Sequence, residues 1–299
     1  MDRRPQLTGP DATAHSTAEN GAGPSARRRI GRGLPVSWLV LPGLALIAVF
    51  FIVPLGIMVA RSLFDPSPLN YLHFVESSLY PRVLFCTLWM AALVTLLCLL
   101  VGYPFAYLMC HAGGGVGTLL AAIVLLPFWS SLFVRTYAWT ILLRDTGLIN
   151  TVLQSLHLIR EPLPLLYNNG AVLLGLVYGY LPFMVLPIYA TLERLDPALV
   201  EAAADLGARP LTTVWRVIVP LSMPGIRAGA ILVFIPTLGA YLTPDLLGGG
   251  RTVLIGNLVQ NQFTTARDWP FGAAVSIALM ALVTLVLAVL LRRQSEPLV

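Results

Sequence analysis

Lysine is absent from this sequence of 299 residues, in which all 19 basic residues are arginine. A Walker A loop needs a lysine on the phosphates of ATP, so the chain does not hydrolyse ATP through such a loop. Schiff-base chemistry on a lysine amine is excluded as well. Charge in general is scarce, because 11% of the residues are charged and 57% are hydrophobic, whereas about 25% are charged in soluble domains. The composition therefore predicts a membrane protein.

Cysteine and histidine are also few. Cys86, Cys98 and Cys110 lie in one apolar stretch without metal-ligand spacing, which is typical of small buried side chains. The four histidines fall in the predicted tail, in loops or at loop edges, and the sequence has no H-E-x-x-H or G-x-S-x-G motif. We therefore predict no catalytic residue, no metal site and no cofactor on this chain, and we disfavour an intramembrane enzyme.

The polar and apolar residues separate along the chain. Residues 1–34 are rich in Gly, Pro, Ser, Thr and Arg and are predicted to be a disordered cytoplasmic tail. A cleavable signal peptide is the alternative, which the long polar leader and the long apolar run after it disfavour. Residues 35–299 are predicted to form one transmembrane domain, since about 20 apolar residues cross a bilayer as a helix. The expected fold class is an all-α membrane protein with six transmembrane helices, at Trp38–Ala60, Arg82–Cys110, Thr118–Val134, Ala171–Leu192, Gly225–Leu247 and Pro270–Leu291.

The arginines predict the orientation. With the amino terminus in the cytoplasm, twelve of the 19 arginines fall on the cytoplasmic side, six of them in the tail. The positive-inside rule favours this topology, with both termini cytoplasmic. Because the tail arginines serve orientation in this interpretation, we expect no binding of nucleic acid.

The charged segment 193–223 separates the fourth and fifth spans and has the local signals of two short helices. Asp196 is a suitable N-cap and Pro197 suits the first helical position. Gly207 suits the left-handed position that ends a helix, and a second helix is expected over Pro210–Pro220. Taken alone, this pattern fits a helical hairpin on the bilayer surface or under the bundle as well as one that inserts into a partner's groove.

The order Glu201-Ala202-Ala203, three residues, Gly207, nine residues and Val217-Ile218-Val219-Pro220 resembles the EAA loop of ABC importer permeases. Val217 and Val219 stand where the family pattern has Ile and Leu. The resemblance implies a type I ABC importer permease fold whose cytoplasmic coupling helices dock on an ATPase. The implied coupling residues are Glu201, Ala202, Ala203, Gly207 and Pro220.

The stretches Pro127–Asn150, Tyr167–Pro197 and Pro236–Phe263 are similar to the spermidine/putrescine branch of these permeases. The resemblance implies a non-catalytic subunit in a bacterial inner membrane. Its implied partners are a second homologous permease, a dimer of ATP-binding cassette ATPases that binds the ATP, and a periplasmic substrate-binding protein. Two alternatives stay open: the same class of importer with another small organic or metal substrate, and an ion-coupled secondary transporter.

The fifth span is the best candidate for the substrate pathway, because Pro236, Gly239 and Pro244 interrupt it, and broken helices often line transporter sites. A carboxylate and an aromatic ring there would suit a polyamine cation. The alternative is that the carboxylate of Asp245 anchors the helix end near the lipid headgroups. The candidate pathway residues are Tyr241, Asp245, Tyr178 and Trp129.

Overall fold

The computed structural model describes residues 36–64, 79–112 and 115–292, and the side chains of 40–64, 79–112 and 115–288. Over these residues the chain consists of helices joined by turns, as predicted. The predicted tail, residues 1–34, lies outside the described residues. The chain divides into two compact units, Met1–Ile52 and Val53–Val299.

The described part of the first unit is a helix that passes into a π-turn. The second unit begins at Val53, the first residue of the next helix. The elements are α1 (Val36–Ile47), the π-turn η1 (Ala48–Ile52) and α2 (Val53–Phe64). The apolar stretch Val40–Phe64 is long enough to cross a membrane, and its side chains are largely exposed, as expected of a lipid-facing helix.

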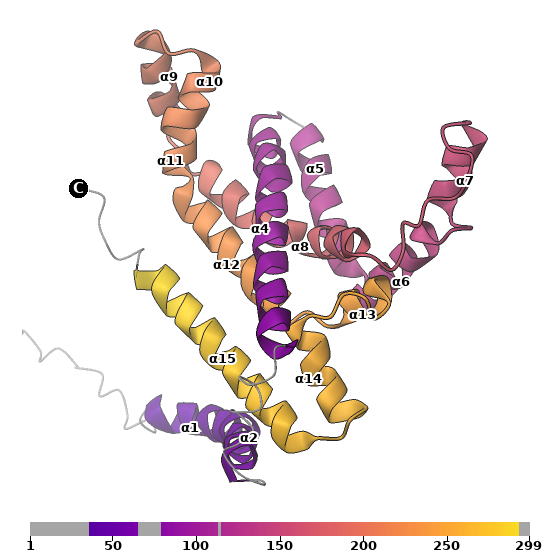
Figure 1. Cartoon of the computed structure of the whole chain (residues 1–299). Coiled ribbons are helices and arrows are strands. Elements are labelled where there is room, and N and C mark those ends of the chain that lie inside the picture. The colour runs from indigo at the N-terminus through magenta and orange to yellow at the C-terminus, as the bar shows by residue number, and fades with distance from the viewer. Residues whose placement is uncertain (1–35, 65–78, 113–114, 293–299) are drawn as a thin grey trace, which may run out of the picture. The chain divides into compact units, whose positions relative to one another are not determined.

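Three long helices form the core of the second unit (Figure 1): α4 (Leu79–His111), α8 (Asn169–Leu192) and α12 (Met223–Leu238). Glycines bring their backbones together, because a methyl group at Gly229 would lie 2.8 Å from the Met184 sulfur. A methyl group at Gly102 would lie 3.3 Å from a Val185 methyl carbon. The fully buried core side chains include Val94, Cys98, Met184, Val185 and Val233.

The remaining elements flank this core. They are α5 (Gly115–Leu125), the 3-10 turn η2 (Leu126–Trp129), α6 (Leu132–Leu143), α7 (Leu148–Ser155), α9 (Pro197–Asp205), α10 (Pro210–Thr213), the π-turn η3 (Val214–Ile218), α11 (Val219–Leu221), α13 (Leu242–Gly248), α14 (Ile255–Thr264) and α15 (Trp269–Arg292). α15 packs against α14 and α2. Val83, Ile255, Phe271 and Val275 form a second, smaller buried cluster.

Four helices are long and apolar enough to span a membrane, and two bent helix pairs bring the number to six if each pair is one span. The third expected span, Thr118–Val134, is such a pair, since the chain bends by 99° between Gly115–Trp129 and Leu132–Ser155. The Ser131 hydroxyl accepts a hydrogen bond from the Phe133 amide at 3.3 Å and so begins a new helix. The fourth span, by contrast, is one unbroken helix.

The fifth expected span, Gly225–Leu247, is broken near its end, as predicted. α12 stops at Leu238, and α13 begins after a break at residues 239–241. The cause is that Pro244 has no N–H to offer the Ala240 carbonyl, and Gly239 favours leaving the helix. The interruption predicted at Gly239 and Pro244 is therefore present and divides the stretch into two helices, whereas Pro236 lies within α12 and does not end it.

Candidate functional site

The predicted coupling segment is a helical hairpin, residues 196–221, which we call the coupling hairpin. The Asp196 carboxylate accepts a hydrogen bond from the Ala198 amide at 3.0 Å, and Pro197 is the first helical residue of α9. Gly207 has φ +78°, the left-handed conformation expected of it. The Gly207 amide donates to the Ala204 carbonyl, and the Ala208 amide donates to the Ala203 carbonyl. These bonds form a Schellman cap, so the local sequence specifies the turn without tertiary contacts.

The second arm of the coupling hairpin departs from the prediction. Pro220 was expected to end the helix, but the helical run continues to Leu221. The π-turn η3 explains the difference, because the Val219 amide bonds back five residues to the Val214 carbonyl. The wider turn accommodates the next residue, Pro220, which has no N–H. The chain then bends by 65° between Pro210–Leu221 and Met223–Leu238.

The coupling hairpin exposes large apolar side chains. Leu206 is 89% exposed, Leu211 70% and Trp215 67%. The alternative in which the hairpin is packed under the bundle is therefore wrong for these residues. Of the implied coupling residues, Glu201, Ala202, Gly207 and Pro220 are exposed and Ala203 is half-buried. Exposed apolar groups of this kind mark a protein or membrane contact.

The coupling hairpin is nevertheless anchored at its base. Ile218 is buried, and Leu195 and Val214 pack against the core. A cavity of about 420 Å³ lies between α9 and the ends of α4 and α8, and Glu193 and Glu201 line it. The hairpin is thus fixed at one end and free at its tip.

The joint between the coupling hairpin and α12 is closely packed on one side and open on the other. Ser222 is fully buried at this joint. A methyl group at Gly225 would lie 2.7 Å from the Pro187 carbonyl oxygen, so α12 contacts α8 directly. On the other side, an apolar cavity of about 530 Å³ is lined by Tyr103 and Trp215, among other residues. The joint therefore has a close contact with α8 on one side and an apolar cavity beside η3 on the other.

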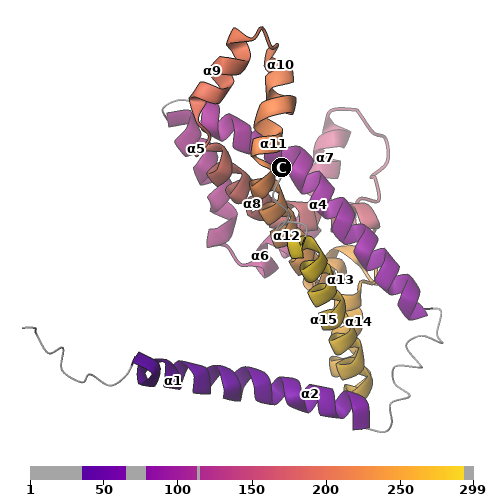
Figure 2. The same ribbon diagram turned by 90° about the vertical axis from the view of Figure 1, so that its left-hand side faces the viewer.

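Figures 1 and 2 show the coupling hairpin at one end of α12. Helices α13 and α14 lie at the opposite end of α12. At this second end, the buried Asn257 side chain donates to the Tyr241 carbonyl at 2.8 Å. A methyl group at Gly256 would lie 2.6 Å from the Ala240 carbonyl oxygen and 2.8 Å from that of Gly239. Only glycine permits this approach of α14 to the helix break.

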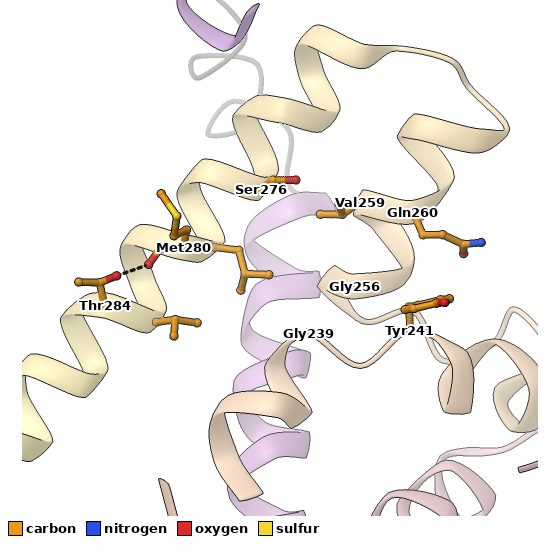
Figure 3. Close-up of a pocket in the computed structure, with 10 residues that line it drawn as sticks. Gly239, Tyr241, Gly256, Val259, Gln260, Ser276, Met280 and Thr284 are labelled. Atoms are coloured by element: carbon orange, nitrogen blue, oxygen red, sulfur yellow. Dashed lines mark hydrogen bonds between the residues drawn. The ribbon is translucent and has the colours of Figure 1, made fainter. Parts of the chain in front are cut away.

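A cavity of about 420 Å³, which we call the break cavity, lies between the end of α12, α14 and α15 (Figure 3). Ser276, Met280 and Thr284 line it from α15. Both hydroxyls bond to carbonyls of their own helix, that of Ser276 to Gly272 and that of Thr284 to Met280. The lining residues are Gly239, Tyr241, Gly256, Val259, Gln260, Ser276, Leu279, Met280, Val283 and Thr284, none of them charged.

The four predicted pathway residues do not meet in one cavity of the described structure. Tyr241 lines the break cavity, whereas Asp245 is exposed on α13. Tyr178 packs its ring edge-on against Trp139 at a centroid distance of 5.6 Å. Trp129 is 93% exposed at the end of η2. The pathway role of these residues stays a prediction, and Tyr241 is the one with a cavity beside it.

Sequence reasoning missed Gly256, Asn257 and Gln260. They belong to α14, and they reach the helix break only through tertiary packing, for which the local sequence carries no signal. Among residues 36–64, 79–112 and 115–292, no three His, Cys, Asp or Glu side chains are placed to share a metal ion.

Comparison with known proteins gives consistent matches. Residues 28–299 match the family model described as binding-protein-dependent transport system inner membrane component. The spermidine/putrescine transport system permease protein PotB of Haemophilus influenzae is 40% identical, with 86% of this chain and 90% of the relative covered. PotB of Escherichia coli K12 is 42% identical, with 85% and 93% covered.

Solved structures share the fold. A bacterial ABC transporter involved in the import of the acidic polysaccharide alginate has a chain that superimposes with a TM-score of 0.68 at 18% identity, covering 87% of this chain and 96% of that one. A second structure, of a bacterial alginate ABC transporter with a pentasaccharide-bound periplasmic protein, gives a TM-score of 0.65 at 19% identity and covers 86% and 91%.

Proposed function

The chain belongs to the binding-protein-dependent transport system inner membrane components, and we propose that it is the permease subunit of an ATP-driven importer of polyamines such as spermidine and putrescine. One observation carries the substrate class: relatives at 40% and 42% identity over most of the chain are spermidine/putrescine permeases. The net charge of the expected outer loops does not support the assignment of a cationic substrate, because these loops hold nearly equal numbers of acidic and basic residues.

The chain carries no cofactor in this proposal, and a partner ATPase binds the ATP. The absence of lysine supports a separate source of energy, since a P-loop requires that residue. The coupling hairpin supplies the contact, because its apolar tip is exposed and its base is joined to α12. Closure of the ATPase dimer would displace the hairpin, and α12 would carry the displacement to the helix break. The bundle then alternates between inward-open and outward-open states.

The other proposed partners are a second, homologous permease and a periplasmic substrate-binding protein. A single set of six spans is small for enclosing a pathway, which supports a dimer of permeases. A solved structure with the same fold was determined with its periplasmic protein bound. We place the chain in a bacterial inner membrane with both termini and the coupling hairpin in the cytoplasm, because twelve of the 19 arginines then lie inside.

The test is uptake of labelled spermidine and putrescine by proteoliposomes that contain the chain, its partner permease and the ATPase, with the binding protein added. We expect uptake to require both ATP and the binding protein and to persist when ionophores collapse the ion gradients. Uptake that ionophores abolish while ATP is present would indicate a secondary transporter. ATP-dependent transport of another substrate without polyamine uptake would retain the importer class and refute the polyamine assignment.

A further inference from the structure

The break cavity combines the end of a helix with unpaired backbone oxygens. α12 ends at Leu238, and the carboxyl end of a helix carries a partial negative charge. Among the described residues, no N–H or O–H group donates to the carbonyl oxygens of Gly239 and Ala240. Both oxygens lie against Gly256, and Gly239, but not Ala240, is among the residues that line the cavity. This end of the cavity therefore attracts a cation.

The helix break is held in this conformation from outside. The Asn257 amide nitrogen donates to the Tyr241 carbonyl, and its oxygen accepts from the Leu254 amide at 3.4 Å. Gly256 keeps α14 close to the break, because any larger residue would meet the carbonyls of Gly239 and Ala240. The unpaired oxygens are thus fixed by α14, and Asn257 is a positioning residue for Tyr241.

Two further polar groups on the cavity wall have no partner. The Tyr241 hydroxyl and the Gln260 side-chain amide make no hydrogen bond within the described part of the chain. Figure 3 shows both residues on the side of the helix break and α14, opposite α15. Tyr241 is 46% exposed, which leaves its ring accessible. An aromatic face and carbonyl oxygens are the groups that attract an ammonium ion in a protein.

The opposite wall, from α15, is mostly apolar. Leu279, Met280 and Val283 line it, and the Ser276 and Thr284 hydroxyls beside them are already bonded to carbonyls of their own helix. The volume of about 420 Å³ lies within the range of small-molecule sites, about 300–1,000 Å³. A site with cation-attracting groups at one end and an apolar wall beside them fits a molecule in which charged nitrogens alternate with methylene groups.

We infer that the break cavity is a binding site for one ammonium group and the adjoining methylene segment of a linear polyamine on its way through the membrane. The ammonium group lies against the Tyr241 ring and the Gly239 carbonyl, Gln260 provides a further hydrogen bond, and the methylenes contact Leu279 and Met280. The inference rests on the proposed import of polyamines and specifies where this chain holds the substrate.

The test compares Tyr241→Leu with Tyr241→Phe in proteoliposomes of the complete importer, with spermidine uptake and binding-protein-stimulated ATP hydrolysis measured on the same vesicles. Tyr241→Phe keeps the aromatic face, and its uptake should stay within about twofold of the unchanged importer. Tyr241→Leu should lower uptake by about 5- to 30-fold, as expected for the loss of a cation–π contact. Stimulated hydrolysis should continue in both variants, because the coupling hairpin is untouched.

Tyr137→Leu is the matched control. Tyr137 is 50% exposed on α6 and does not line the break cavity, so its loss should leave spermidine uptake unchanged. If Tyr241→Leu does not assemble, Gln260→Leu tests the same site, and its uptake should fall by several-fold while hydrolysis persists.

The outcomes distinguish the proposed binding site in the break cavity from the proposed import of polyamines. Unchanged uptake by Tyr241→Leu, in an importer that does move spermidine, would overturn the site and leave the proposed function intact. The same loss in Tyr137→Leu would also overturn the site. An unchanged importer that moves no polyamine would refute both the substrate class and this site.

Discussion

The Tyr103 hydroxyl on α4 lies 3.2 Å from the hydroxyl of Ser222, the residue at which the coupling hairpin turns into α12. The Ser222 hydroxyl donates to the Val219 carbonyl at 3.0 Å. Because a hydroxyl has one proton, Tyr103 is then the donor to Ser222. The bond joins the hairpin's base to the central helix of the core, beside the apolar cavity next to η3.

We predict that Tyr103→Phe lowers the amount of polyamine moved per ATP by about 2- to 10-fold. This range corresponds to the free energy of one hydrogen bond, about 0.5–1.5 kcal/mol. The reason is that the hairpin would move without displacing α12 to the same extent. Uptake and hydrolysis measured together in proteoliposomes give the ratio. Ser222→Ala, which also loses the bond to Val219, should have at least this effect, and the double variant should be no worse than Ser222→Ala alone. Additive losses would contradict a shared contact.

Gly207 should be replaceable only by residues that tolerate the left-handed conformation. Its φ is +78°, and a side chain would meet no atom within 4 Å, so conformation alone restricts the position. Gly207→Pro fixes φ near −65° and removes the N–H that bonds to the Ala204 carbonyl. We expect it to uncouple hydrolysis from transport while the spans stay folded, as judged by yield and thermal unfolding. Gly207→Asn is the control and should remain coupled, because asparagine occurs at such caps.

The exposed apolar side chains of the coupling hairpin should govern association with the ATPase. Trp215→Ala is expected to weaken co-purification of the ATPase subunit by about 30-fold, corresponding to about 2 kcal/mol for a buried interface tryptophan. Titration of the purified ATPase onto the permease complex in detergent measures this. Phe85→Ala is the control, since Phe85 is 70% exposed on α4 and outside the coupling hairpin. Equal affinity for Trp215→Ala and the unchanged chain would show that Trp215 does not contact the ATPase.

The coupling hairpin was predictable from the sequence because its signals are local. Asp196, Pro197 and Gly207 act through hydrogen bonds to their neighbours in the chain, and the structure shows each in the expected position. Pro220 was misjudged because the effect of a proline depends on the hydrogen bonds before it. A π-turn ends two residues before Pro220, and another ends two residues before Pro54. In both places the helix therefore continues past the proline.

The break cavity was only partly predictable. Gly239 correctly indicated the interruption, whereas Pro236 lies within α12 and does not end it, and Tyr241 followed from its place in that stretch. Gly256 and Gln260 contribute through the packing of α14 on the helix break, and the mixed polar and apolar sequence around them, IGNLVQNQFT, does not show which residues reach that break. Similarly, Gly175 and Gly179 of α8 have the spacing of small residues that permit close helix contact, but the sequence does not show that only Gly175 is closely packed, against Leu247.

Some glycines of the bundle are in close contact with a neighbouring helix, and others have space around them. This difference gives a prediction about stability. A methyl group at Gly225 would lie 2.5 Å from the Thr191 hydroxyl oxygen and 2.7 Å from the Pro187 carbonyl oxygen. Gly225→Ala should therefore destabilise the bundle by about 1–3 kcal/mol, the usual cost of overpacking. At Gly179 the nearest atom, Leu132 Cδ1, would be 3.6 Å away, and Gly179→Ala should be nearly neutral. Thermal unfolding in detergent compares the two, and equal melting temperatures would contradict the α8–α12 contact.

The orientation can be tested with single cysteines on a chain whose three own cysteines are replaced by alanine. Leu206 at the tip of the coupling hairpin is 89% exposed, and Leu158 after α7 is 68% exposed, so cysteines at both positions are accessible to reagent. The arginine distribution predicts that Leu206 lies in the cytoplasm and Leu158 outside. A membrane-impermeant maleimide should label Leu158→Cys in spheroplasts, and Leu206→Cys only after the membrane is opened. Labelling of Leu206→Cys in sealed spheroplasts would place the coupling hairpin on the outside, where no ATPase could reach it, and the proposed mechanism would then be wrong.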